Sequence, residues 1–137
     1  MRALLFSCIA IFTVIFWSGC TITTTKTRNP VFISQEKLES ELMSIVTSDN
    51  VNLNGQEITK NKKTTSELEI SVTNGKNIPS NEDEMKSLGK SIATCVKRNL
   101  KDANQFNTYK VLFVTSMEKN GITKRTWTGN VFSSEEL

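Results

Sequence analysis

The chain has 137 residues, a length that suffices for one domain but not for two domains with separate cores. Its formal net charge is +3. It contains no histidine, so histidine bases, histidine-containing triads and His-ligated zinc are excluded. The net charge is too small to indicate binding to nucleic acid.

The first 19 residues form an apolar leader. Fourteen of them are apolar, Arg2 is their only ionisable side chain, and Ser18, Gly19 and Cys20 follow the apolar run. A short positive region, an apolar stretch and small residues at its end are the pattern of a secretory signal peptide. The run of about 15 residues is shorter than the roughly 20 that a membrane-spanning helix needs. We therefore predict a signal peptide over residues 1–19.

The end of the leader, Trp17-Ser18-Gly19-Cys20, resembles the lipobox of bacterial lipoproteins. In that family the cysteine thiol carries a diacylglycerol, the signal is cut just before the cysteine, and the new amino group is usually acylated. The resemblance implies cleavage between Gly19 and Cys20 and a lipid anchor on Cys20. Trp17 departs from the family pattern, which has an aliphatic residue three positions before the cysteine. An uncleaved signal anchor and ordinary secretion are the alternatives.

The residues after the leader predict a tether followed by one domain. By the sorting rules of that family, Thr21 is not the aspartate that retains lipoproteins at an inner membrane, so an outer-membrane location facing the periplasm is favoured. Residues 21–30 are polar and β-branched without core periodicity, as in a flexible linker. We assign residues 20–33 to the lipidated cysteine and this tether, and residues 34–137 to a single small domain.

Two helices are predicted in the domain. The first covers about residues 34–48, with Ser34 as its N-cap. The second covers about residues 81–101, with Asn81 as its N-cap. Cys95, the only cysteine outside the leader and the lipid site, falls on the apolar side of the second helix. That position is typical of a buried small hydrophobe.

Four strand-like runs accompany these helices, and Asn-Gly dipeptides typical of turns lie within or after three of them. The runs span residues 51–58, 66–73, 109–117 and 122–132. The first run is predicted to be either a short strand or a tight hairpin about Asn54-Gly55, and a polar loop over residues 59–65 follows it. Two loop residues, Asn120 and Gly121, predict a hairpin between the last two runs.

The fold class that follows is α+β. We predict a two-layer sandwich of a small, mainly antiparallel sheet with two helices on one face, in the order α-β-β-α-β-β. In the last hairpin, the two-residue turn pairs Val114 with Trp127, Leu112 with Gly129, and Lys110 with Val131.

Both faces of that hairpin carry apolar residues, and two helices cover only one side of a small sheet. We predict that Trp127 is a core anchor facing the second helix. The opposite face, with Tyr109, Phe113 and Phe132, is then the candidate interaction face for a partner or a ligand. The alternative is that residues 31–33 fold back over these aromatic side chains and bury them.

Charged residues offer no catalytic pattern. Lys60, Lys62 and Lys63 could contact anionic head groups, but their loop is not adjacent to Cys20 in sequence, and we expect it to be solvated. Metal-ligand spacing, glycine-rich phosphate loops and serine nucleophile motifs do not occur in the sequence. We therefore expect no catalytic residues, no metal and no cofactor.

Residues 74–137 look like small uncharacterised bacterial envelope lipoproteins. The resemblance rests on Asn-Gly-Lys-Asn-Ile-Pro at 74–79, Tyr-Lys-Val-Leu-Phe-Val at 109–114 and Thr-Trp-Thr-Gly at 126–129. It supports the class and implies no specific activity.

The leading hypothesis is a lipid-anchored, non-catalytic module that binds or assembles with an envelope protein through its sheet face, and that binds no nucleic acid. One alternative is a carrier of a small apolar ligand in the periplasm, which requires a pocket of about 300 Å³ or more. The other alternative is a purely structural envelope lipoprotein without a partner.

Overall fold

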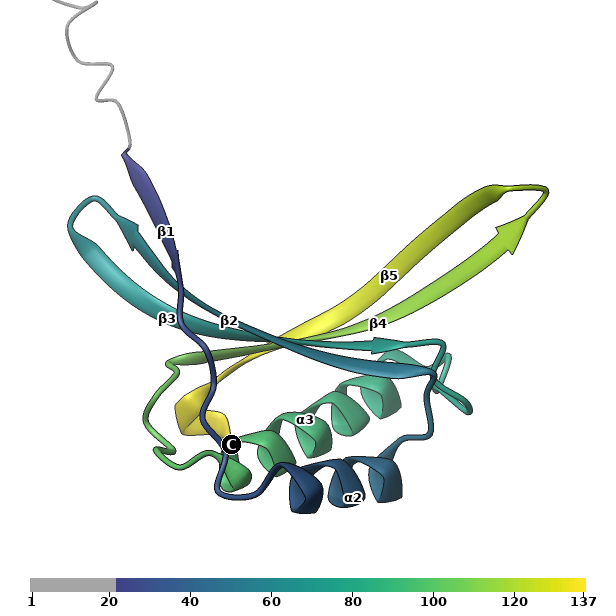
Figure 1. Ribbon diagram of the computed structural model, residues 1–137, viewed down its shortest axis with the longest axis horizontal. Coiled ribbons are helices and arrows are strands. Elements are labelled where there is room, and N and C mark those ends of the chain that lie inside the picture. The colour runs from purple at the N-terminus through teal and green to yellow at the C-terminus, as the bar shows by residue number, and fades with distance from the viewer. Residues whose placement is uncertain (1–21) are drawn as a thin grey trace, which may run out of the picture.

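Five strands lie side by side in sequence order, and two helices pack beneath them, in the computed structural model, which describes residues 22–137 (Figure 1). The strands are β1 (Thr23–Thr27), β2 (Asn50–Lys60), β3 (Lys63–Thr73), β4 (Thr108–Lys119) and β5 (Ile122–Ser133). The helices are α2 (Gln35–Ile45) and α3 (Glu82–Asn99), and the short 3₁₀ turn η1 (Ser134–Glu136) follows β5. The predicted signal peptide and the lipid site at Cys20 lie outside the described residues.

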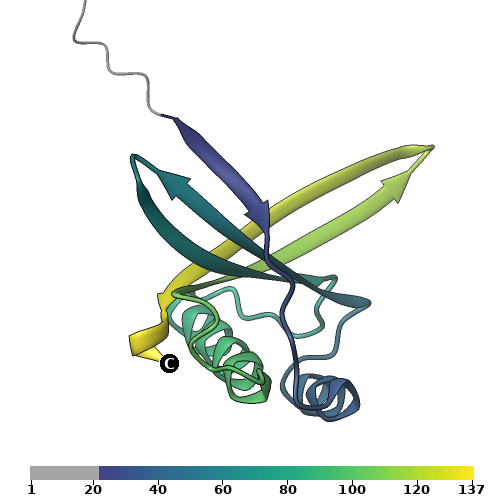
Figure 2. The ribbon, with the colours of Figure 1, turned by 60° about the vertical axis from the view of Figure 1, so that its left-hand side comes forward.

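The predicted α+β class is confirmed, and the sheet is mixed. Neighbouring strands are antiparallel except β3 and β4, which are parallel and are connected through α3. The predicted order α-β-β-α-β-β is wrong at its start, because β1 precedes α2. The β2–β3 and β4–β5 hairpins form two arms that rise from the strongly twisted sheet on the side away from the helices (Figures 1 and 2).

Strand β1 forms where the sequence predicted a flexible tether. It pairs antiparallel with β2, from Thr23 opposite Lys60 to Thr27 opposite Gln56. All five residues of β1 are exposed, so its side chains show none of the apolar alternation that marks a half-buried strand. Backbone pairing and the extended preference of β-branched threonine account for this strand.

Of the two alternatives for residues 51–58, the strand is right and the turn at Asn54-Gly55 is wrong, because β2 continues through these residues. The predicted polar loop over residues 59–65 is also wrong, since all but two of its residues belong to β2 and β3. The turn lies at Asn61 and Lys62, whose φ angles of 50° and 65° are those of a two-residue hairpin loop. A glycine is needed at position 55 for another reason, because the backbone of residue 28 passes close to it. A Cβ atom there would lie 2.0 Å from the Arg28 carbonyl oxygen.

Local signals predicted the helix starts and the last hairpin correctly. Ser34 Oγ accepts the backbone N–H of Lys37 at 3.3 Å and caps α2. Asn81 caps α3 by accepting two backbone N–H groups. The register of β4 and β5 is the one predicted, with Val114 opposite Trp127, Leu112 opposite Gly129 and Lys110 opposite Val131.

The core lies between the sheet and the helices, but the face of β4 and β5 that enters it is the opposite of the predicted one. Tyr109, Phe113 and Phe132 are buried, whereas Trp127 is 71% exposed. Helix α3 covers this face, since an added Cβ at Gly89 would contact the Phe132 ring at 3.5 Å. The predicted core role of Trp127 and the predicted exposure of the three aromatic residues are therefore both wrong.

We predict that Gly55→Ala destabilises the domain by about 1–3 kcal/mol, because the new methyl group forces the backbone of residue 28 away from β2. Thermal unfolding of the purified chain measures this loss. Gly89→Ala is the matched control: its Cβ has ordinary contacts of 3.5 Å, and alanine favours the helix by about 1 kcal/mol, so its melting temperature should not fall. Equal melting temperatures for Gly55→Ala and the native chain would contradict the close approach.

Candidate interaction surface

The side of the sheet that faces away from the helices carries an apolar patch. Its members lie on the two neighbouring strands β4 and β5: Leu112, Val114, Trp127 and Val131. Trp127 and Val131 are 71% and 60% exposed, while Leu112 and Val114 are half-buried. Together these four side chains form a partly exposed apolar surface around a tryptophan, one of the residue types enriched among the contacts that dominate protein–protein binding.

A glycine keeps this patch continuous. Leu112 lies opposite Gly129 in the β4–β5 register, and a Cβ atom at Gly129 would come within 2.7 Å of the Leu112 Cδ2 atom. The leucine side chain therefore lies across β5 in the space that the missing side chain leaves. The patch depends on a small residue at position 129.

Polar groups border the patch on the side of β3. Lys110, which pairs with Val131 across the hairpin, donates a hydrogen bond from its Nζ atom to Glu69 Oε2 at 2.9 Å. This hydrogen bond raises the pKa of Lys110, so its ammonium group stays charged at physiological pH. The side-chain amide of Gln56 on β2 donates a hydrogen bond to the Glu67 carboxylate on β3 at 3.0 Å. The apolar patch of the free face is thus confined to part of β4 and β5, and polar side-chain pairs lie beside it on β2 and β3.

Strand β5 is an edge of the sheet within the described chain. It is 12 residues long, contains no proline, and its outer backbone groups pair with no strand among residues 22–137. Such an edge can accept an added strand from another chain. Lys124 and Arg125 lie on it, so an acidic segment would match its charge.

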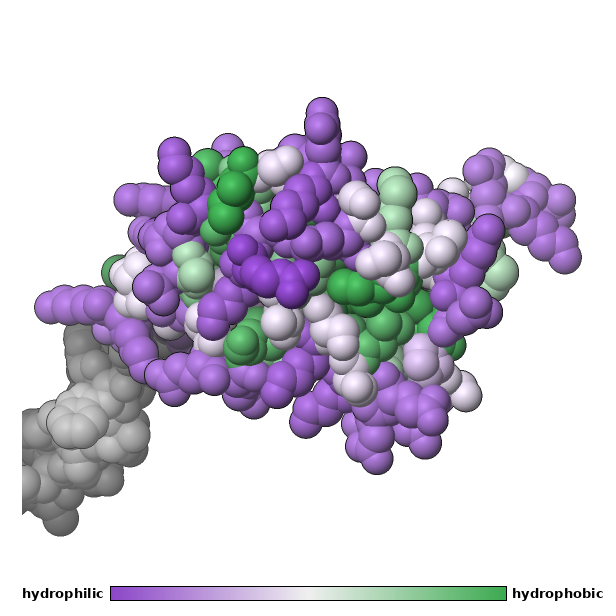
Figure 3. All heavy atoms as spheres, turned by 90° about the horizontal axis from the view of Figure 1, so that it is seen from below, coloured by the Kyte–Doolittle hydropathy of each residue, from purple (hydrophilic) through white to green (hydrophobic). Residues whose placement is uncertain are grey.

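A groove lies on the helix side, between α2 and the beginning of β2. Its volume is about 510 Å³, and it is lined by Leu38 and Leu42 of α2, by Val46 at the C-cap of that helix, and by Val51 and Leu53 of β2. Figure 3 shows this side of the molecule, where hydrophilic residues cover most of the surface and hydrophobic ones form separate clusters. This volume lies within the range of about 300–1,000 Å³ that is typical of pockets for small ligands.

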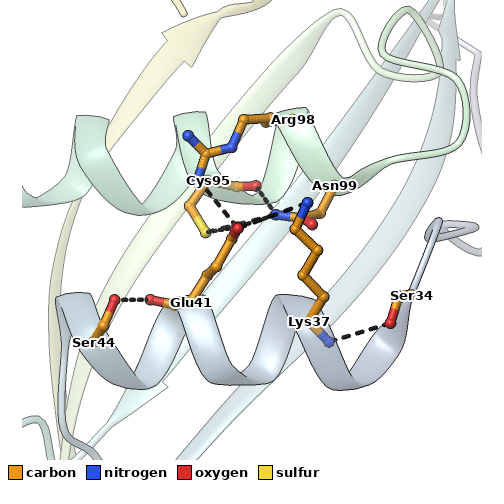
Figure 4. Close-up of polar contacts among 7 residues, drawn as sticks. All are labelled: Ser34, Lys37, Glu41, Ser44, Cys95, Arg98 and Asn99. Atoms are coloured by element: carbon orange, nitrogen blue, oxygen red, sulfur yellow. Dashed lines mark hydrogen bonds and ion pairs between the residues drawn. The ribbon is translucent and has the colours of Figure 1, made fainter.

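A polar cluster joins the two helices (Figure 4). Glu41 of α2 accepts hydrogen bonds from Asn99 at 2.5 Å, from Arg98 at 3.1 Å and from the Cys95 thiol at 3.6 Å. The hydrogen bond from Asn99, followed by that from Arg98, lowers the pKa of Glu41. Burial and then the hydrogen bond to Glu41 raise the pKa of the Cys95 thiol, which therefore stays protonated and is a poor nucleophile.

The predicted interaction residues lie together, but inside the core rather than on a surface. The alternative, burial under residues 31–33, is right about the burial and wrong about most of the cover: Val31 and Ile33 are exposed, only Phe32 packs against the core, and helix α3 covers the Phe132 ring. The hydroxyl of Tyr109 has no hydrogen-bond partner among the described residues, and burial raises the pKa of Tyr109 to about 12.

The sequence contains a signal that places the apolar patch on the free face of the sheet, opposite to the predicted orientation. On β4, the face that holds Leu112 and Val114 also carries Lys110 and Glu118. The opposite face begins with three apolar or aromatic residues in a row, Tyr109, Val111 and Phe113. Charged residues in alternation mark the solvated side of a strand. Counting them would have placed Trp127 on the free face.

Comparisons with other proteins add no assignment: no protein-family model, no curated protein and no solved structure matches the chain. Among residues 22–137, no group of acidic or cysteine side chains has the arrangement of a metal site. In the same part of the chain, none of the helices combines the length and the apolar character required to cross a membrane.

We predict that Trp127→Ala changes the free energy of unfolding by no more than about 1 kcal/mol, because the side chain is largely in water and loses only its contacts across the hairpin. Phe113→Ala, on the same strand pair but in the core, should cost about 3–5 kcal/mol. Denaturant unfolding of both variants measures the difference. A loss for Trp127→Ala as large as that for Phe113→Ala would contradict the assignment of the two faces.

Proposed function

We propose that this protein is a lipid-anchored, non-catalytic binding module of the bacterial envelope, held at the outer membrane and facing the periplasm. Its partner is an envelope protein that adds an extended segment to the free edge of β5. The apolar patch contacts alternate side chains of that segment, and Lys124 and Arg125 favour acidic residues in it. The protein therefore acts by binding and assembly rather than by chemistry.

The main observation that supports this proposal is the exposure of the Trp127 side chain. A tryptophan that is 71% exposed, on the same face of β5 as the exposed Val131, costs free energy in water, and a partner strand on β5 would remove apolar surface of both side chains from solvent. Recognition by strand addition obtains affinity from backbone hydrogen bonds and specificity from alternate side chains. The patch lies on β5 and its neighbour β4, next to the position that an added strand would occupy.

The position of the predicted anchor supports the same function. The lipid on Cys20 precedes β1, and β1 and β5 are the opposite edges of the sheet. Four strand spacings separate these edges, roughly 19 Å along the sheet. Two or three acyl chains hold a protein stably on a bilayer, and at this separation the anchor leaves β5 accessible.

Two observations favour binding over catalysis. The sequence contains no histidine, which removes the commonest general base. The only cysteine in the described chain, Cys95, donates its thiol hydrogen to Glu41, and the raised pKa of that thiol opposes a nucleophilic role.

The groove between α2 and β2 supports a second candidate function, the transport of a small apolar ligand. Its volume of about 510 Å³ fits such a ligand, and Met43 at its rim is 72% exposed. Methionine adapts its shape to different apolar molecules. This function uses the helix side of the domain and leaves the apolar patch unexplained, so we rank it second.

The proposed function is tested with a photoreactive amino acid at Thr123, four residues from Trp127 on the same face of β5, in the full chain in living cells. Irradiation should join the chain to one envelope protein. Adding Trp127→Ala should reduce this product more than about tenfold, as expected when a central aromatic contact is lost. The same photoreactive residue at Thr25, on the opposite edge strand, is the matched control and should give no such product.

The anchor is tested in the same cells by Cys20→Ala, which should leave an uncleaved precursor without incorporated fatty acid. Fatty-acid labelling of this variant would contradict the anchor. A Thr123 product that is insensitive to Trp127→Ala would contradict binding through the patch.

The ligand-transport candidate predicts saturable fluorescence enhancement of the apolar probe N-phenyl-1-naphthylamine when it binds the purified chain. Met43→Lys places a charge at the groove rim and should abolish this signal without unfolding the domain, because Met43 is exposed. Trp127→Ala is the control and should bind the probe normally. Equal probe binding by native chain and Met43→Lys would exclude the groove as the ligand site.

A further inference from the structure

The tip of the β2–β3 hairpin carries three lysines that the fold brings next to the predicted lipid anchor. Lys60 and Lys63 face each other at the end of the hairpin, and Lys62 lies in the turn between them. Lys60 also pairs with Thr23, the first residue of β1. The register of β1 therefore joins two segments that lie about 40 residues apart in the sequence.

The covalent chain limits how far this tip can lie from the lipid. Cys20 precedes Thr23 by three residues, and three residues span at most about 11 Å when fully extended. A lipid on Cys20 would thus hold the bilayer surface close to the end of the hairpin. The sequence alone predicts a solvated loop here, because the pairing of β1 with β2 depends on contacts between distant residues.

The positive charge at the tip is uncompensated within the described chain. None of the ion pairs among residues 22–137 includes Lys60, Lys62 or Lys63. The nearest carboxylate along β2 is Glu57, three residues before Lys60, and it already pairs with Arg28 at 3.4 Å. The three lysines are exposed and free to meet an external anion.

An apolar residue accompanies this charge. Ile22, immediately before β1, is 75% exposed. A segment that combines an exposed aliphatic side chain with several lysines is typical of contact with the interfacial region of a bilayer, where the lysines meet head groups and the aliphatic side chain meets the acyl boundary.

We propose that the β2–β3 hairpin tip docks on anionic phospholipid head groups of the same bilayer that holds the anchor. This inference rests on the lipid anchor of the proposed function. Each lysine near an anionic surface multiplies the ratio of docked to undocked domain about fivefold, so three lysines together contribute about 100-fold. The anchor supplies attachment, and the hairpin tip supplies orientation.

Docking in this way would set how the domain stands on the membrane. The two helices lie on the side of the sheet opposite to the hairpin arms (Figures 1 and 2). With the β2–β3 tip on the bilayer, α2 and α3 face away from it, and the β5 edge is held at a fixed distance from the surface.

The test uses the lipidated full chain, purified from membranes and reconstituted into vesicles of phosphatidylcholine alone or of phosphatidylcholine with phosphatidylglycerol. Co-flotation with each vesicle type is measured first. Lysines are then acetylated with an N-hydroxysuccinimide ester, and mass spectrometry gives the rate at each lysine. Acetylation of Lys60, Lys62 and Lys63 should be more than fivefold slower on the anionic vesicles, and high salt should remove this protection because it screens exposed charges.

Three lysines of the helix side serve as internal controls in the same sample: Lys76, Lys86 and Lys101, which are exposed and lie outside the hairpin arms. Their acetylation rates should be equal on both vesicle types. Equal rates at the hairpin tip on both lipids, with the chain floating on both, would overturn the docking and leave the anchor intact. A chain that does not float with phosphatidylcholine vesicles would overturn the anchor and with it this proposal.

Discussion

The parallel pairing of β3 and β4 across α3 is the constraint on which the rest of this structure depends. Two neighbouring parallel strands need a long connection that crosses one face of the sheet, and here α3 is that connection. Whichever face it covers becomes the core, and its apolar stripe must meet apolar side chains there. Tyr109, Val111 and Phe113 of β4 meet that stripe. The patch around Trp127 is left on the free face as a direct consequence.

The same crossover makes the two hairpins into separate arms. Since β3 and β4 run in the same direction, the turn that precedes β3 and the turn that follows β4 lie at opposite ends of the parallel pair. The strong twist of the sheet then carries both tips away from the helices (Figure 2). One arm ends in lysines beside β1, and the other bears the apolar patch. Under the proposed function, a single sheet would thus separate the end that meets the membrane from the edge that binds a partner.

Features set by nearby residues were predictable from the sequence, and features set by distant contacts were not. The caps at Ser34 and Asn81 and the register about Asn120-Gly121 depend on a few adjacent residues, and all three predictions are confirmed. The orientation of β4 and β5 depends on where α3 packs, and apolar alternation on both faces left that choice open. The charges at Lys110 and Glu118 could have decided it.

Strand β1 shows a different limit of sequence analysis. All five of its side chains are exposed without apolar alternation, so composition predicts a linker. Pairing with the free backbone groups of β2, together with the extended preference of threonine, makes it a strand. The consequence for the proposed function is mechanical. A flexible tether of about 13 residues would let the domain sample every orientation above the bilayer, whereas β1 fixes Thr23 to Lys60 and leaves three residue steps between the sheet and Cys20. With so short a connection, the distance of the β5 edge from the proposed anchor would be set by the spacing of the strands in the sheet rather than by the fluctuations of a flexible linker.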